Sequence, residues 1–192
     1  MESNTGIIAW AAKHASSLIS PLGNRWLHTQ GVVERAQQVG EALDEEYREL
    51  LVAAAYIHDI GYAPELLVTG FHPLDGAYYL LSHNQERLAS LVAYHSEAQF
   101  EAQLRGLAAE LNTIPQEHST VADALTYCDM TTGTTGLHIS FEERLEDIFQ
   151  RYDEGHIVSR AIHQAIPSLT RAVKQTQRIL SQNERSNKRG TS

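Results

Sequence analysis

The stretch that most constrains this chain runs from Leu50 to Pro64 and reads LLVAAAYIHDIGYAP. Its first eight residues are apolar and rich in alanine, which predicts a buried helix. That helix ends in His58 and Asp59. Because burying an unpaired charge costs several kcal/mol, the pair requires either a hydrogen-bond network or a metal ion that neutralises the carboxylate and binds the imidazole nitrogen. Taken alone, the pair favours the network; the other histidines of the chain reverse that preference.

Length and charge limit what such a chain can be. At 192 residues with 42% hydrophobic content, it is long enough for one substantial domain with its own core. A net charge of -9 and a pI near 5.5 argue against a nucleic-acid duplex or an anionic membrane surface as the main partner. A small phosphorylated substrate is not excluded, because a bound metal ion supplies local positive charge.

Cysteine usage and the N-terminal sequence bear on the compartment. The single cysteine, Cys128, allows no intramolecular disulfide, so a reducing compartment is expected. The N-terminus lacks the basic start and long apolar core of a signal peptide, and no apolar run approaches the ~20 residues that span a bilayer. We therefore expect a soluble, cytoplasmic protein, and the sequence is compatible with a homo-oligomer.

Helical periodicity extends over most of the chain, and the fold is predicted to be all-α, a single helical bundle. A domain is expected over residues 1–182, with its core at 22–135, followed by a disordered tail at 183–192 that lacks apolar periodicity. Ser140 and Glu143 form a predicted capping box. The only weak strand candidate is GLHIS at 136–140. The predicted helices cover residues 6–19, 22–43, 45–58, 74–82, 86–94, 98–111, 119–130, 141–152, 157–166 and 168–182.

Histidines and aspartates that end or interrupt these apolar helices form a chemically consistent set. Four imidazoles and two carboxylates suit two divalent transition-metal ions. A carboxylate can bridge two ions through its two oxygens, whereas a neutral imidazole cannot, so Asp59 is the natural bridge. Cys128 is predicted to point into the core, which argues against a cysteine-type zinc site. The set comprises His28, His58, Asp59, His72, His95 and Asp129.

This order of residues, H…HD…H…H…D, resembles the HD-domain superfamily of metal-dependent phosphohydrolases. The resemblance implies that His28, His58, Asp59 and Asp129 hold one ion. In branches with two ions, Asp59, His72 and His95 would hold the second, and the presence of both extra histidines favours two ions over one. The cofactors expected are thus divalent metal ions (Mn, Fe, Co, Ni, Zn or Mg). The matching stretches are RWLHTQGV (25–32), AAYIHDIGY (54–62), GFHPLDGAYYL (70–80), LVAYHS (91–96) and ALTYCDMTTG (124–133).

Some positions depart from the family pattern or carry two interpretations. Tyr62 stands where many dinuclear phosphodiesterases of the superfamily have lysine, and the extension typical of cyclic di-GMP enzymes is missing after His95, so cyclic di-GMP is not expected as the substrate. Arg25 resembles the arginine that contacts phosphate in nucleotide-cleaving members, but an ordinary surface arginine explains it equally well. Asp75 is expected to favour the exposed N–H groups at a helix start rather than to bind metal.

The predicted function is hydrolysis of a phosphoester in a nucleotide or another small phosphorylated metabolite by a metal-activated water. Asp59, Asp129 and Arg25 are the expected catalytic residues. A di-iron oxygenase of the same superfamily is the alternative, since it shares the ligand set, and a non-catalytic ligand-binding or regulatory module is a third reading. The remaining histidines are expected to be solvent-exposed: His14, His83, His118, His138, His156 and His163.

Overall fold

The predicted buried helix lies at the centre of the fold. In the computed structural model, which describes residues 5–190, α3 (Glu45–Ile57) packs against α1, α2, α5 and α8. Its alanines let the neighbouring helices approach closely, and residues 50–55 are all buried. Asp44 occupies the N-cap position, although its side chain makes no capping hydrogen bond. His58 and Asp59 are thereby carried into the middle of the molecule.

All regular elements of the described residues are helices and none is a β-strand, which confirms the all-α prediction. The strand candidate at 136–140 supplies one isolated bridge, between Thr132 and His138. No described helix combines the length and apolarity needed to traverse a bilayer. The remaining elements are α1 (Thr5–Ile19), η1 (Ser20–Leu22), α2 (Asn24–Gly40), η2 (Ile60–Tyr62), η3 (Pro64–Leu66), α4 (His72–Ser82), α5 (Glu86–Tyr94), η4 (His95–Glu97), α6 (Gln99–Arg105), α7 (Ala108–Leu111), α8 (Thr120–Met130), α9 (Phe141–Arg151) and α10 (Ile157–Gly190).

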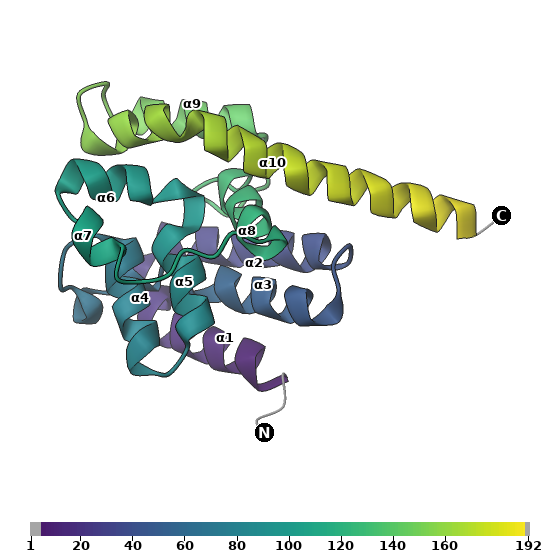
Figure 1. Ribbon diagram of the computed structural model, residues 1–192, viewed down its shortest axis with the longest axis horizontal. Helices are drawn as coiled ribbons and strands as arrows, with labels where there is room; N and C mark the ends of the chain where they lie inside the picture. The colour runs from purple at the N-terminus through teal and green to yellow at the C-terminus, as the bar shows by residue number, and fades with distance from the viewer. Residues whose placement is uncertain (1–4, 191–192) are drawn as a thin grey trace.

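The C-terminal helices form a separate layer over this core. Helix α10 packs against α6 and α8, and Figure 1 shows α9 beside it, with the end of α10 projecting beyond the other helices. Helix α9 begins at the predicted capping box, in which Ser140 accepts from the Glu143 N–H and the Glu143 carboxylate accepts from the Ser140 N–H. This box fixes where α9 starts and therefore where its side chains meet the core.

Two expectations about the C-terminal region are wrong. Residues 157–166 and 168–182 were expected to form two helices, yet α10 continues through Pro167, which lies on its exposed face while Ala165 and Leu169 stay buried on either side. The tail expected to be disordered from residue 183 is helical to Gly190. Extending an existing helix adds one hydrogen bond per residue, so no buried face is needed to continue it. Residues 191 and 192 lie outside the described part.

Candidate metal centre

His58 presents an unpaired nitrogen to the interior. Its side chain is completely buried, and its Nδ1 lies 2.8 Å from the carbonyl oxygen of Ala55. Since a carbonyl only accepts hydrogen bonds, Nδ1 must carry the proton, and the neutral ring then directs a lone pair from Nε2. That Nε2 is buried without a hydrogen-bond partner. A buried polar atom in this state costs about 1–3 kcal/mol, a cost that a metal ion at Nε2 would remove.

His28 on α2 and Asp129 near the end of α8 face the same point. His28 Nδ1–H donates to the carbonyl of Gly133 (3.0 Å), so its Nε2 is an acceptor lying 3.0 Å from the acceptor oxygen Oδ1 of Asp129. Two acceptors at this distance require a cation between them, either a proton or a metal. The ligand atoms of His28, His58 and Asp129 all lie within 4.8 Å of one another. We call these three residues the first donor group.

A second donor group lies beside the first. It consists of Asp59, His72 and His95, whose ligand atoms are again within 4.8 Å of one another. His95 Nδ1–H donates to the carbonyl of Val92 (2.6 Å), which leaves Nε2 as an acceptor 3.3 Å from His72 Nε2. Two donors that each lie about 2.1 Å from one ion at a right angle are about 3 Å apart, so the observed spacings suit a shared ion.

Asp59 joins the two groups through its separate oxygens. Oδ2 lies 3.3 Å from His58 Nε2 and 4.0 Å from His28 Nε2. Oδ1 lies 3.3 Å from His72 Nε2 and 3.9 Å from His95 Nε2. One oxygen therefore faces each group, which is the arrangement that a bridging carboxylate requires. The donor set and its spacing fit a pair of divalent ions.

The electrostatics of both groups favour cations. Burial opposes ionisation of Asp59, but Arg25 and His58 outweigh it and hold its pKa well below the usual range. Burial likewise opposes ionisation of Asp129, and the hydrogen bond and charge of His28 hold its pKa well below the usual range. Burial lowers the pKa of both His72 and His95. The two carboxylates are thus ionised and these two imidazoles neutral near neutral pH, the states in which each binds metal.

The pKa of His58 shifts in the opposite direction to those of His72 and His95. Its burial acts to lower its pKa, but Asp59 outweighs that effect and raises the value. Without a metal ion, His58 therefore takes up a proton on Nε2 more readily than a free imidazole does, and this proton lies beside Asp59 Oδ2. A metal ion in the first donor group has to displace that proton.

Arg25 lies at the rim of the centre and contacts a predicted ligand directly. Its Nη1 donates to Asp59 Oδ2 at 2.7 Å, and its guanidinium lies 3.9 Å from the centroid of the Tyr62 ring. The Tyr62 ring in turn stacks on His72 at 4.0 Å, with the planes 17° apart. Sequence reasoning noted Tyr62 only as a departure from lysine. The structure shows that its ring packs between Arg25 and His72, so Arg25 is not an ordinary surface residue.

A cavity of about 550 Å³ opens onto both donor groups. One wall carries Arg25, Asp59, His72, His95 and Asp129. Another part of the wall comes from α9 and α10 and the segment between them, including Arg144, Arg151, Tyr152 and Ile162. Sequence analysis missed this second wall. The signal available was the strong amphipathicity of FEERLEDIFQRY, in which an arginine falls on the inward face.

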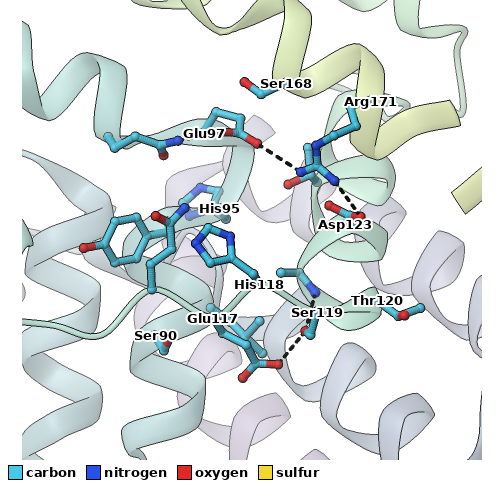
Figure 2. A pocket seen from close by; sticks show the side chains of 16 residues that line it. Ser90, His95, Glu97, Glu117, His118, Ser119, Thr120, Asp123, Ser168 and Arg171 are labelled. Atoms are coloured by element: carbon cyan, nitrogen blue, oxygen red, sulfur yellow. Dashed lines mark hydrogen bonds and ion pairs between the residues drawn. The ribbon is translucent and has the colours of Figure 1, made fainter. Parts of the chain in front are cut away.

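A larger cavity, of about 640 Å³, lies elsewhere and touches the centre only at His95 (Figure 2). Its polar walls are largely paired among themselves. Arg171 of α10 donates to Asp123 at 3.0 Å, and Glu117 accepts from the Ser119 hydroxyl at 2.5 Å. None of the other five donor residues lines it. Size alone therefore does not identify the functional cavity in this molecule.

The turn between the two cavities holds Asp129 in place. Ser96 directly follows His95 and has a left-handed backbone, with φ of 50°. A non-glycine residue in this conformation costs about 1–2 kcal/mol. The Ser96 hydroxyl donates to Asp129 Oδ2, which leaves Oδ1 of that carboxylate directed at His28. Ser96 thus acts on the first donor group while its neighbour His95 belongs to the second.

The other residues noted in the sequence have structural roles. Asp75 was expected to favour the first turn of α4; instead its carboxylate accepts from the preceding Thr69 and Gly70 N–H groups at 2.8 and 3.1 Å, and so fixes the loop before His72. Cys128 is buried and belongs to neither donor group.

The prediction that the remaining histidines are exposed is wrong for two of them. His14 is half-buried, with its ring stacked at 4.1 Å on that of Trp10. His138 is also half-buried and lies 3.2 Å from the Gly31 carbonyl oxygen. The other four are exposed as predicted: His83, His118, His156 and His163.

Comparison with known proteins gives one result. A protein-family model described as HD domain matches residues 25–128, which is more than half of the 192 residues. The match begins at Arg25 and ends one residue before Asp129, so α9, α10 and the second wall of the cavity lie beyond it. No curated protein and no solved structure gives a significant match.

Proposed function

This chain belongs to the HD domain family, and from that premise we propose that it is a metal-dependent hydrolase of phosphoesters. The proposed substrate is a nucleotide or another small phosphorylated metabolite, and the proposed cofactors are two divalent ions. The observation that carries the proposal is that the two oxygens of Asp59 face two separate donor groups. The lone cysteine, Cys128, favours a reducing, cytoplasmic setting for this activity.

Each donor group has residues suited to hold one ion. His28, His58 and Asp129 would hold the first, His72 and His95 the second, and Asp59 would contribute to both. When bound, such ions lower the pKa of a coordinated water and withdraw charge from phosphate oxygens. The chain orients three of its own ligands, His58, His28 and His95, through Nδ1–H bonds to the carbonyls of Ala55, Gly133 and Val92, which leave the Nε2 of each ring as the acceptor.

The protein groups around the donors support an anionic substrate. Arg25 is charged, about one third exposed, and directed at Asp59. The Arg25 guanidinium donates to Asp59 and lines the cavity, and if ions were to neutralise Asp59 its donors would suit phosphate oxygens. Stacking on Tyr62 limits where that guanidinium can lie, so Tyr62 positions it. Asp129, held by Ser96 at one oxygen, is suited to orient the attacking water as well as to bind an ion.

The test is an anaerobic assay of the protein loaded separately with Mn²⁺, Co²⁺, Ni²⁺ or Mg²⁺ against a panel of phosphorylated metabolites. We expect release of phosphate or of a phosphomonoester, abolished in Asp59→Asn. Turnover that requires iron and O₂, with no phosphoester cleaved under any metal, would identify an oxygenase instead. Bound metal without any turnover would identify a binding module.

A further inference from the structure

The wall that α9 contributes to the metal cavity contains a buried arginine. Arg144 is only 7% exposed and lies on the same face as Phe141 and Ile148, which are 8% and 6% exposed. These positions follow the spacing of an inward-facing helix stripe, where apolar residues are normally found. Taking a guanidinium out of water is costly unless its donors are satisfied, so a position like this calls for an anionic partner.

The partners that Arg144 has within the chain are too few. Its Nη1 donates to Asp147 at 3.1 Å, and its Nη2 lies 3.7 Å from Asp129 Oδ1, too far for a good hydrogen bond. Its Nε is buried with no partner. Asp129 Oδ1 is also the oxygen directed at His28, so an ion in the first donor group would claim its charge.

Asp147 is shared with a second arginine. Arg151, two turns after Arg144 and the last residue of α9, donates to the same Asp147 oxygen at 2.9 Å and lines the same cavity. One carboxylate therefore serves two guanidiniums, which leaves a net positive charge on this wall. Arg25 lines the same cavity, beside Asp59. The cavity thus has cationic groups from both α2 and α9.

We propose that Arg144 and Arg151 form a subsite for a second anionic group of the substrate, distinct from the phosphate that reacts at the metal centre. The inference rests on the proposed function and narrows its substrate class to metabolites that carry two anionic groups. The second group is a phosphoryl group or a carboxylate, since both offer the paired oxygens that a guanidinium binds. Substrates with a neutral leaving portion leave the buried donors of Arg144 unsatisfied and react more slowly.

Binding of unreactive probes to the Mn²⁺-loaded protein tests this directly by calorimetry. Methylphosphonate carries one anionic group, whereas methylenediphosphonate carries two phosphonates and phosphonoacetate a phosphonate and a carboxylate. Arg144→Gln should weaken the two-anion probes roughly 10- to 100-fold, the range for loss of a charged hydrogen bond, and change methylphosphonate binding less than about twofold. Comparing the two larger probes shows which second group the subsite prefers.

Two further variants secure the result. Arg151 is one third exposed, so Arg151→Gln is expected to fold even if Arg144→Gln does not, and it should weaken the same two probes selectively. Arg171→Gln is the matched control, since that arginine pairs with Asp123 outside the metal cavity. Manganese content, measured for every variant, must be unchanged.

An equal loss of affinity for all three probes, or no loss for any, overturns the subsite. These readings need no turnover, so they separate this inference from the reaction. If the variants lose affinity only for the two-anion probes, and no metal-loaded protein cleaves a phosphoester, the subsite is retained and the hydrolase is rejected. If the protein cleaves phosphoesters but the variants lose affinity equally for all probes, the hydrolase is retained and the subsite is rejected.

Discussion

Gly61 offers the sharpest perturbation of the second donor group. It lies in η2, immediately beyond Asp59 and Ile60, against the first turn of α4. A Cβ at this position would lie 2.0 Å from the carbonyl oxygen of His72 and 2.6 Å from the amide nitrogen of Gly76. Both are backbone atoms, so no side chain can rotate away. Gly61→Ala therefore forces α4 and η2 apart.

The size of the displacement follows from the contact. Ordinary van der Waals contact for a Cβ begins at 3.4 Å, so the His72 carbonyl must move by about 1.4 Å. Overpacking of this kind costs about 1–3 kcal/mol, which the remaining helices can absorb. Metal ligands, however, tolerate only about 0.2 Å. His72 travels with its own carbonyl, so the second ion should be lost while His28, His58 and Asp129 keep the first.

The assay is manganese per chain after gel filtration, with circular dichroism to establish folding. Native protein should hold two ions and Gly61→Ala one. Gly133→Ala is the control, because its Cβ would meet its nearest neighbours at 3.5 Å, and it should retain both. If Gly61→Ala is folded yet binds two ions with native affinity, or loses both together, the division into two groups is wrong.

The remaining predictions concern single side chains. His58→Ala should lose metal and activity yet remain helical, because it removes a ligand of the first donor group but no large apolar side chain of the core; metal content and circular dichroism of the purified variant test this. Arg25→Ala should lower kcat/KM by an amount that corresponds to about 1.5–3 kcal/mol of lost transition-state stabilisation. Metal content should be unchanged, since no ion ligand is removed. Burial opposes ionisation of Glu117, but hydrogen bonds from Arg87 and Ser119 lower its pKa, so this glutamate stabilises the fold above its usual pKa of 4.5 and the contribution disappears as pH falls through the lowered value. Glu117→Gln should accordingly show a flatter fall in Tm below that pH.

The donor residues could be predicted from the sequence because each breaks an apolar pattern. Burying a histidine and an aspartate at the end of LLVAAAYI costs free energy unless they are paired, and this can be recognised from the sequence alone. The proposal that Asp59 bridges two ions follows from the chemistry of a carboxylate alone. Which oxygen faces which histidine depends on the packing of α2, α4 and α8 around α3, and only the structure shows it.

Contacts between distant segments explain what the sequence did not reveal. Arg25 and Tyr62 are 37 positions apart, and neither carries a pattern that predicts stacking. Arg144 resembles any charged residue of a surface helix until α9 is placed against the metal cavity. The continuation of α10 through residue 183 was missed for a different reason. Apolar periodicity reports burial, and an exposed helical extension has none.

The central claim is that Asp59 lies between two ions, each held by its own donor group. Anomalous diffraction from crystals grown with Mn²⁺ tests it most directly. We predict two peaks in the anomalous difference map, one among His28, His58 and Asp129 and the other between His72 and His95, each adjacent to a different oxygen of Asp59. No peak, a single peak at full occupancy, or peaks that leave Asp59 outside the coordination of either ion would contradict the account.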